Sequence, residues 1–190
     1  MDEKTVLEII DFFYPAEDDL KRTLLKHSCQ VREKALELAA ATEVALDLEV
    51  VGAGAMLHDI GIKLCHAPDI YCVGELPYLR HGIAGAELLR NYGAERGMAL
   101  EIFARICERH TGSGLTAFEI KSRQLPLPER DFMPETPEEK IICLADKFFS
   151  KSGDMKEKAF EKVQRSRAKF GSDSLERFNV LWSFFTFRSF

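Results

Sequence analysis

The stretch Val50-Val-Gly-Ala-Gly-Ala-Met-Leu-His-Asp-Ile-Gly61 decides the fold of this chain. Its first eight residues are small or apolar on every side of a helix, which predicts a helix buried in the centre of the protein. His58 and Asp59 follow this apolar run directly. Aspartate is rarely buried without a positive partner, because a carboxylate loses its hydration there. We therefore expect a positive group to meet Asp59.

Helical spacing of apolar residues dominates on both sides of this stretch. We expect helices over about residues 18–42, 81–92, 98–110, 137–150 and 173–187, with a charged helix between Gly153 and Gly171. Residues 61–79 and 124–137 contain several prolines or glycines and are expected to form loops. The sequence predicts an all-α bundle of about seven to nine helices, with residues 1–154 as the main domain and 155–190 as a C-terminal helical extension.

Composition and charge indicate a globular protein and exclude several other classes. The chain has 190 residues, 46% of them hydrophobic and 30% charged, which is ordinary for a compact globular protein and excludes a disordered or collagen-like chain. Its net charge of −5 gives no general attraction to nucleic acid or anionic lipid. We therefore expect neither duplex nucleic acid nor a membrane among its partners.

The cysteines and the N-terminal residues bear on the cellular compartment of the protein. Five cysteines are dispersed along the chain without a close pair, which favours a reducing environment over a disulfide framework. The start, MDEKTVLEII, lacks the basic residues and long apolar core of a signal peptide. No apolar run approaches the roughly 18 residues of a membrane span. We predict a cytoplasmic protein.

Histidine and aspartate are placed at the edges or on the apolar faces of the expected helices. A lone histidine on such a face is usually a core residue, and Lys63 or Lys147 would satisfy the aspartates by ordinary salt bridges. The alternative is a metal site whose mixed nitrogen and oxygen donors suit Fe, Mn, Co, Ni or Zn better than Mg or Ca alone. Its candidate ligands are His27, His58, Asp59, His81, His110 and Asp146. Spacing alone leaves both interpretations open.

The order of these residues resembles the HD-domain superfamily of metal-dependent phosphohydrolases, in its HDIG form. The resemblance covers about residues 20–150 and rests on His27, on His58-Asp59-Ile60-Gly61, and on Asp146 at the end of Ile-Ile-Cys-Leu-Ala-Asp. Two further segments, Arg80-His81-Gly82 and Glu108-Arg109-His110-Thr111-Gly112, are similar to those that carry the extra histidines of a dinuclear subgroup.

The resemblance implies an HD-domain-like helical bundle with one or two divalent transition-metal ions (Fe, Mn, Co, Ni or Zn, with Mg as a further candidate). One ion would be held by His27, His58, Asp59 and Asp146, and the second by Asp59, His81 and His110. Two such ions lower the pKa of a bound water and supply hydroxide for attack at phosphorus. The resemblance also implies catalytic roles for Asp59 and Lys63, and the residues expected to bind substrate are Lys63, Arg80, Arg109 and Thr111.

We accordingly predict a metal-dependent phosphohydrolase that cleaves a phosphate ester or anhydride of a nucleotide or another small phosphorylated metabolite. Two alternatives stay open. A few dinuclear members of the superfamily are mixed-valent di-iron oxygenases, so the ligand set does not settle the reaction. A non-catalytic ligand-binding module is the second alternative, and the presence of all six candidate ligands weakens it.

The C-terminal segment is unusually aromatic. Phe178, Leu181, Trp182 and Phe185 share one helical face. This pattern predicts a helix that packs onto the domain. The alternative is a homodimer formed through the same aromatic helix.

Overall fold

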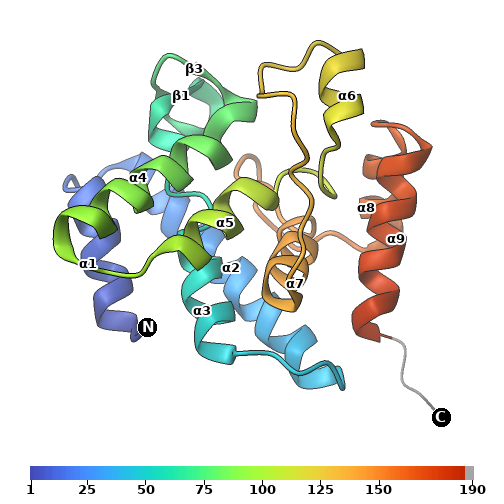
Figure 1. Ribbon diagram of the computed structural model, residues 1–190, viewed down its shortest axis with the longest axis horizontal. Helices are drawn as coiled ribbons and strands as arrows, with labels where there is room; N and C mark the ends of the chain where they lie inside the picture. Colours follow the sequence, from blue (N-terminus) through green and yellow to red (C-terminus); the bar gives the residue numbers. More distant parts are fainter. Residues whose placement is uncertain (187–190) are drawn as a thin grey trace.

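The structure, a computed structural model, describes residues 1–186 and is built mainly of α-helices (Figure 1). Residues 187–190, the end of the expected extension, lie outside the described residues. Within 1–186 the helices are α1 (Glu3–Phe13), α2 (Asp19–Ala41), α3 (Leu48–Leu57), α4 (His81–Arg96), α5 (Glu101–Arg109), α6 (Ala117–Ser122), α7 (Pro137–Asp146), α8 (Phe160–Ala168) and α9 (Ser172–Thr186). The predicted all-α fold of seven to nine helices is confirmed. None of these helices has both the length and the apolar character that crossing a membrane requires.

Helix α3 forms the centre of the bundle and contacts α1, α2, α5 and α7. The Asp47 carboxylate begins it by accepting hydrogen bonds from the backbone N–H groups of Glu49 and Val50. A Cβ atom at Gly54 would come within 2.5 Å of the Ile106 side chain and 2.9 Å of that of Ile142. The small residues of α3 therefore let α5 and α7 approach closely, and this brings the ends of the three helices together.

The segment that follows α3 is more ordered than the predicted loop. It contains three short 3₁₀ turns, at Ile62–Leu64, Pro68–Ile70 and Tyr78–Arg80, and three strands, β1 (Cys65–Ala67), β2 (Cys72–Val73) and β3 (Leu76–Pro77). The strands pair in the order β2-β1-β3. Strands of two or three residues are too short to produce the alternating pattern by which a strand is recognised in a sequence.

Gly61 permits the close packing of this segment on α4. A Cβ atom at this position would lie 2.2 Å from the carbonyl oxygen of His81 and 2.3 Å from the backbone nitrogen of Gly85. Since no side chain fits in that space, glycine at this position allows the turn after Asp59 to lie directly against the first turn of α4.

Two helix ends differ from the sequence prediction. Helix α4 continues through Gly93 to Arg96 and ends at Gly97, which adopts the left-handed conformation typical of a glycine after a helix. Helix α7 ends at Asp146 instead of near Ser150, because the N–H groups of Phe148 and Phe149 bond to carbonyls three residues earlier and tighten the turn. Residues 147–159 thus form an irregular connection to α8.

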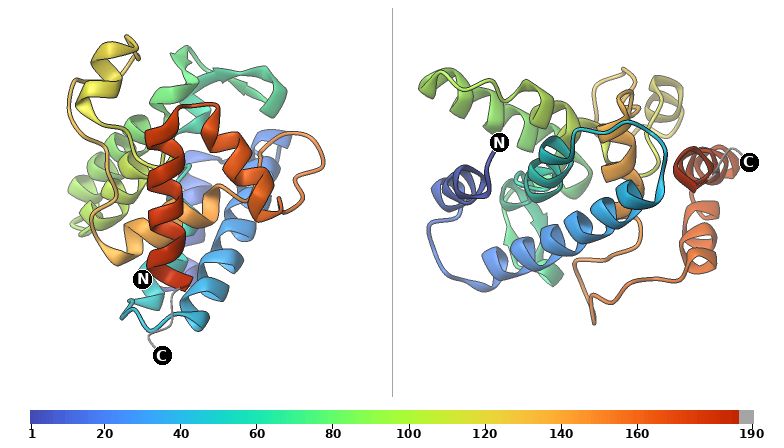
Figure 2. Two further views of the ribbon diagram at one scale, coloured as in Figure 1. Left: turned by 90° about the vertical axis from the view of Figure 1, so that its right-hand side faces the viewer. Right: turned by 90° about the horizontal axis from the view of Figure 1, so that it is seen from below.

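Helices α8 and α9 cover one side of the bundle (Figure 2, left). Phe178, Leu181 and Phe185 of α9 are buried in the main hydrophobic core, and α9 contacts both α2 and α7. The predicted aromatic face therefore packs on the domain. A domain boundary at residue 154 and a homodimer through α9 both remain predictions, and such a dimer would have to use the opposite face of the helix.

Replacing Phe178 with alanine should test whether α9 is part of the cooperative fold. Phe178 is fully buried, and loss of a buried phenylalanine side chain costs about 3–5 kcal/mol. We expect Phe178→Ala to lower the free energy of unfolding in urea by about that amount. The matched control is Phe118→Ala, since Phe118 is 78% exposed and its removal should change stability by less than about 0.5 kcal/mol. Equal effects of the two substitutions would contradict this packing.

Candidate metal centre

Six side chains from separate segments meet at one place in the bundle. The four imidazoles and two carboxylates are those of His27, His58, Asp59, His81, His110 and Asp146. His27 lies within α2, and His81 is the first residue of α4. The other ligand positions lie where helices end: His58 follows α3, His110 follows α5, and Asp146 is the last residue of α7. The convergence expected from the sequence is present.

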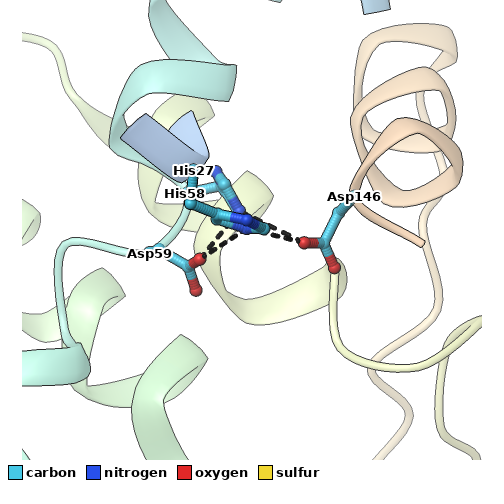
Figure 3. A group of neighbouring side chains, drawn as sticks. All are labelled: His27, His58, Asp59 and Asp146. Atoms are coloured by element: carbon cyan, nitrogen blue, oxygen red, sulfur yellow. Dashed lines mark hydrogen bonds and ion pairs between the residues drawn. The ribbon is translucent and has the colours of Figure 1, made fainter. Parts of the chain in front are cut away.

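The first group consists of His27, His58, Asp59 and Asp146. Figure 3 shows the two imidazoles between the two carboxylates. His27 Nε2 lies 3.1 Å from Asp59 Oδ2 and 3.0 Å from Asp146 Oδ1. His58 Nε2 lies 3.0 Å from Asp59 Oδ2 and 3.6 Å from Asp146 Oδ1. These distances place four donor atoms around a common point.

The second group consists of Asp59, His81 and His110. Here the other carboxylate oxygen, Asp59 Oδ1, lies 3.4 Å from His81 Nε2 and 3.5 Å from His110 Nε2. Asp59 therefore turns one oxygen toward each group. This is the arrangement of a carboxylate shared between two cation sites.

Three of the histidines are oriented in the same way by the backbone. The Nδ1 atoms of His58, His81 and His110 lie 2.7, 2.6 and 2.8 Å from the carbonyl oxygens of Ala55, Tyr78 and Cys107. We assign Nδ1–H as the donor in each pair, which leaves Nε2 directed at the cluster. A hydrogen bond from the outer ring nitrogen is the usual way to fix a metal-binding histidine.

Charge differs sharply between the two groups. Burial alone would lower the pKa of His58, but the carboxylates of Asp59 and Asp146 outweigh it and raise the pKa to about 9. Burial would raise the pKa of Asp59, yet the positive charges of His58 and Lys151 hold it well below its ordinary value. The first group is thus an ion-paired cluster that holds a proton at neutral pH.

His81 and His110 are neutral. Burial, together with the nearby imidazole of His110, lowers the pKa of His81 to about 3, and burial also lowers the pKa of His110. Their Nε2 atoms are 2.9 Å apart. With both Nδ1 atoms donating to carbonyls, two lone pairs face each other at that distance. A cation bound between them would remove this repulsion, so the donor set fits a divalent metal ion.

Buried polar atoms without a well-formed hydrogen bond also indicate an ion site. His58 Nε2 and both carboxylate oxygens of Asp59 are buried and lack a hydrogen bond of normal geometry. Buried polar atoms are nearly always satisfied, and exceptions often mark an ion or a functional group. His58 belongs to the first group, and Asp59 belongs to both groups.

Two lysines also reach the cluster. Lys147 Nζ bonds to Asp146 and, at 2.8 Å, to the carbonyl oxygen of His110. Lys151 Nζ lies 2.6 Å from Asp59 Oδ2. The sequence predicted Lys147 as a partner for an aspartate, but it gave no signal for Lys151, which lies in the irregular connection after α7. Lys63, the other predicted partner, does not contact either aspartate.

The four residues expected to bind substrate differ in their contacts. Lys63 Nζ contacts the carbonyl oxygen of Phe13, and Arg109 binds Glu135 at 2.6 Å and the carbonyl of Met133. Arg80 precedes His81 and its buried Nε atom lacks a hydrogen-bond partner. Thr111 follows His110 and lies beside Gly82. Lys63 and Arg109 are thus paired with groups outside the cluster, and roles in substrate binding remain predictions for all four residues.

Comparison with known proteins now identifies the family. The HD domain family matches residues 24–150, which include most of α2, all of α3 to α7 and all six cluster residues. The chain belongs to the HD domain family. In this HD domain His58 belongs to the first group and Asp59 belongs to both groups.

Several known proteins are similar to this chain in sequence. An uncharacterized protein of Methanocaldococcus jannaschii, MJ0778, is 38% identical over 65% of this chain and 64% of its own length. A protein named tRNA (cytidine(56)-2'-O)-methyltransferase is 37% identical in Picrophilus torridus, over 70% of this chain and 32% of that protein. Its namesake in Thermoplasma volcanium is 32% identical over 96% of this chain and 46% of that protein. The chain therefore spans about a third to just under two thirds of the length of these relatives.

A solved structure has the same fold. The crystal structure of the HD domain of the L. monocytogenes phosphodiesterase PgpH matches with a TM-score of 0.52, covering 93% of this chain and 94% of that chain. The two sequences are 19% identical, so this likeness shows the fold alone.

Single substitutions should separate the two groups. We expect His81→Ala to reduce the number of bound manganese ions from two to one, because His81 belongs only to the second group. Asp59→Ala should remove both ions, since its two oxygens face the two groups. Elemental analysis of protein dialysed against manganese measures this directly. His66→Ala, at an exposed histidine of β1, is the control and should retain both ions. Identical stoichiometry in all three variants would contradict the assignment.

Manganese binding should release a proton near neutral pH. The pKa of His58 is about 9, so this imidazole is protonated at pH 7.5 and must lose its proton before Nε2 binds an ion. We expect release of about one proton as the first group fills, and weaker binding as pH falls. Calorimetry in buffers with different ionisation enthalpies measures the release. The release should disappear above pH 9, and a pH-independent value would disprove this protonation state.

Proposed function

We propose that this protein is a metal-dependent phosphohydrolase that cleaves a phosphate ester or anhydride of a nucleotide or another small phosphorylated metabolite. The observation that carries the proposal is the shared carboxylate: Asp59 Oδ2 faces His27 and His58, while Oδ1 faces His81 and His110. Membership of the HD domain family supports the same class of reaction.

Divalent ions held by these residues would supply a bound hydroxide at neutral pH and would neutralise charge on phosphate oxygens. The chain's own residues prepare the site. The three backbone carbonyls fix the imidazole rings, and Lys147, anchored on the His110 carbonyl, orients the Asp146 carboxylate. Preorganised ligands of this kind are what dinuclear phosphate hydrolysis requires.

Two of the relatives are named as methyltransferases of a tRNA cytidine, and these names support a nucleotide-like substrate. Methyl transfer is a property of those whole proteins, of which this chain matches less than half. A buried cluster of imidazoles and carboxylates is suited to binding cations and to hydrolysis.

A second candidate function is a di-iron oxygenase. The two adjacent groups of imidazoles and carboxylates share Asp59, and a shared carboxylate with histidine ligands also suits a pair of iron ions. Iron-loaded protein would then consume oxygen in the presence of an organic substrate and give a mixed-valence EPR signal. Phosphate release with manganese and no oxygen uptake with iron would decide for the hydrolase.

Asp59→Asn should abolish phosphate release. The substitution keeps the size of the side chain but removes the charge that both groups share, so we expect at least a hundredfold loss of activity, on the order of the effect of losing one strong electrostatic contact in a transition state. The measurement is phosphate release from a panel of nucleotides and dinucleoside polyphosphates with manganese.

His66→Ala again serves as the control and should retain full activity. An Asp59→Asn protein as active as the parent would contradict the proposal. A parent protein that binds manganese and nucleotides without releasing phosphate would favour the non-catalytic module.

A further inference from the structure

The connection between α7 and α8 delivers an ammonium group to the shared carboxylate. Lys151 Nζ lies 2.6 Å from Asp59 Oδ2, and only 11% of its side chain is exposed. Oδ2 is the oxygen that faces His27 and His58. Lys151 therefore takes up part of the space around a ligand atom of the first group.

Contacts on both sides of Lys151 hold this connection in place. The N–H of Lys158, which follows Lys151, donates to the carbonyl of Phe148, which precedes it, at 2.8 Å. Also after Lys151, the carbonyl of Met155 accepts a hydrogen bond from Gln30 of α2 at 2.7 Å, and the Met155 side chain is buried. The position of Lys151 is thus set by the packing of residues 147–159.

Lys151 also lies close to the second group. Its Nζ atom is 5.9 Å from the centre of the Tyr78 ring, and that ring stacks on the imidazole of His81 at 4.8 Å. The ammonium is consequently near both halves of the cluster, at the side formed by Tyr78 and the connection.

A divalent ion at Oδ2 and the Lys151 ammonium compete for the same charge. Once Asp59 neutralises bound cations, the ammonium loses its partner and is repelled by them. A nearly buried ammonium without a counter-ion is unfavourable, so it requires another anion. Lys147 differs, because its bond to the His110 carbonyl does not depend on Asp146 being free.

We propose that Lys151 exchanges partners at this site: its ammonium neutralises Asp59 in the metal-free protein and contacts a phosphoryl oxygen of the substrate when divalent ions are bound. This inference rests on the proposed function and adds a substrate-binding residue to it. It also assigns a function to the connection after α7.

Manganese alone tests the first half. Lys151→Met removes the charge while keeping an unbranched side chain, and we expect its manganese affinity to rise about tenfold, the change that corresponds to losing one competing charge-assisted contact. Lys156→Met is the matched control in the same connection, since Lys156 is 82% exposed, and its affinity should not change. Titration calorimetry measures both.

Inorganic phosphate tests the second half. Added to manganese-loaded protein, it should bind Lys151→Met about tenfold more weakly than the parent, whereas Lys151→Arg, which keeps the charge, should bind it nearly as well as the parent. If Lys151→Met fails to fold, Lys151→Gln should give the same two changes.

Unchanged or weaker manganese affinity in the uncharged variant would overturn the exchange, and unchanged phosphate affinity would overturn the contact. Neither measurement depends on turnover. If both shifts occur but no phosphate ester is hydrolysed, the proposed reaction fails while the role of Lys151 as an anion contact stands.

Discussion

One buried carboxylate organises this structure. Asp59 is wholly inaccessible to solvent, and four imidazoles and one ammonium surround it. An isolated charge buried in this way would be strongly destabilising, whereas a charge met on all sides is tolerated. The groups around Asp59 come from α2, from the end of α3, from α4, from the end of α5 and from the connection after α7. Five separate segments of the chain thus pack around this one carboxylate.

Close backbone packing allows these segments to surround Asp59. Gly54 lets α5 and α7 approach α3, and Gly61 lets the turn after Asp59 touch α4. The close packing at Gly54 brings His110 and Asp146 toward His58. The close packing at Gly61 places His81 opposite Asp59 Oδ1. Small residues in and after α3 thus determine the geometry of a site whose polar residues are spread over more than a hundred positions of sequence.

Sequence patterns predicted the parts of the site that depend on helices. The apolar run before His58 and the apolar faces around His27 and His110 each placed a polar group at the edge of the core, and the resemblance to HD domains linked them. Thr136 caps the start of α7 by accepting a hydrogen bond from the N–H of Glu139, and Pro137 follows it, so the sequence marks where this helix begins. Lys151 was missed because nothing in the sequence marks the end of α7 at Asp146.

The direction of the Lys63 side chain could not be predicted either. Its neighbour in space is the carbonyl of Phe13, fifty positions earlier, and such a contact leaves no local pattern. The short strands β1 to β3 were missed for a similar reason, because their pairing is not expressed in any periodicity.

The three helices that end at the cluster have a further consequence. A helix carries a partial negative charge of roughly half an electron at its C-terminal end. The ends of α3, α5 and α7 all point to this place, so the backbone itself adds negative potential to that of the two aspartates. This backbone potential favours cations at the cluster and partly offsets the positive charges of His58, Lys147 and Lys151 there. The C-terminal ends of three helices therefore contribute to cation binding beside the six side chains.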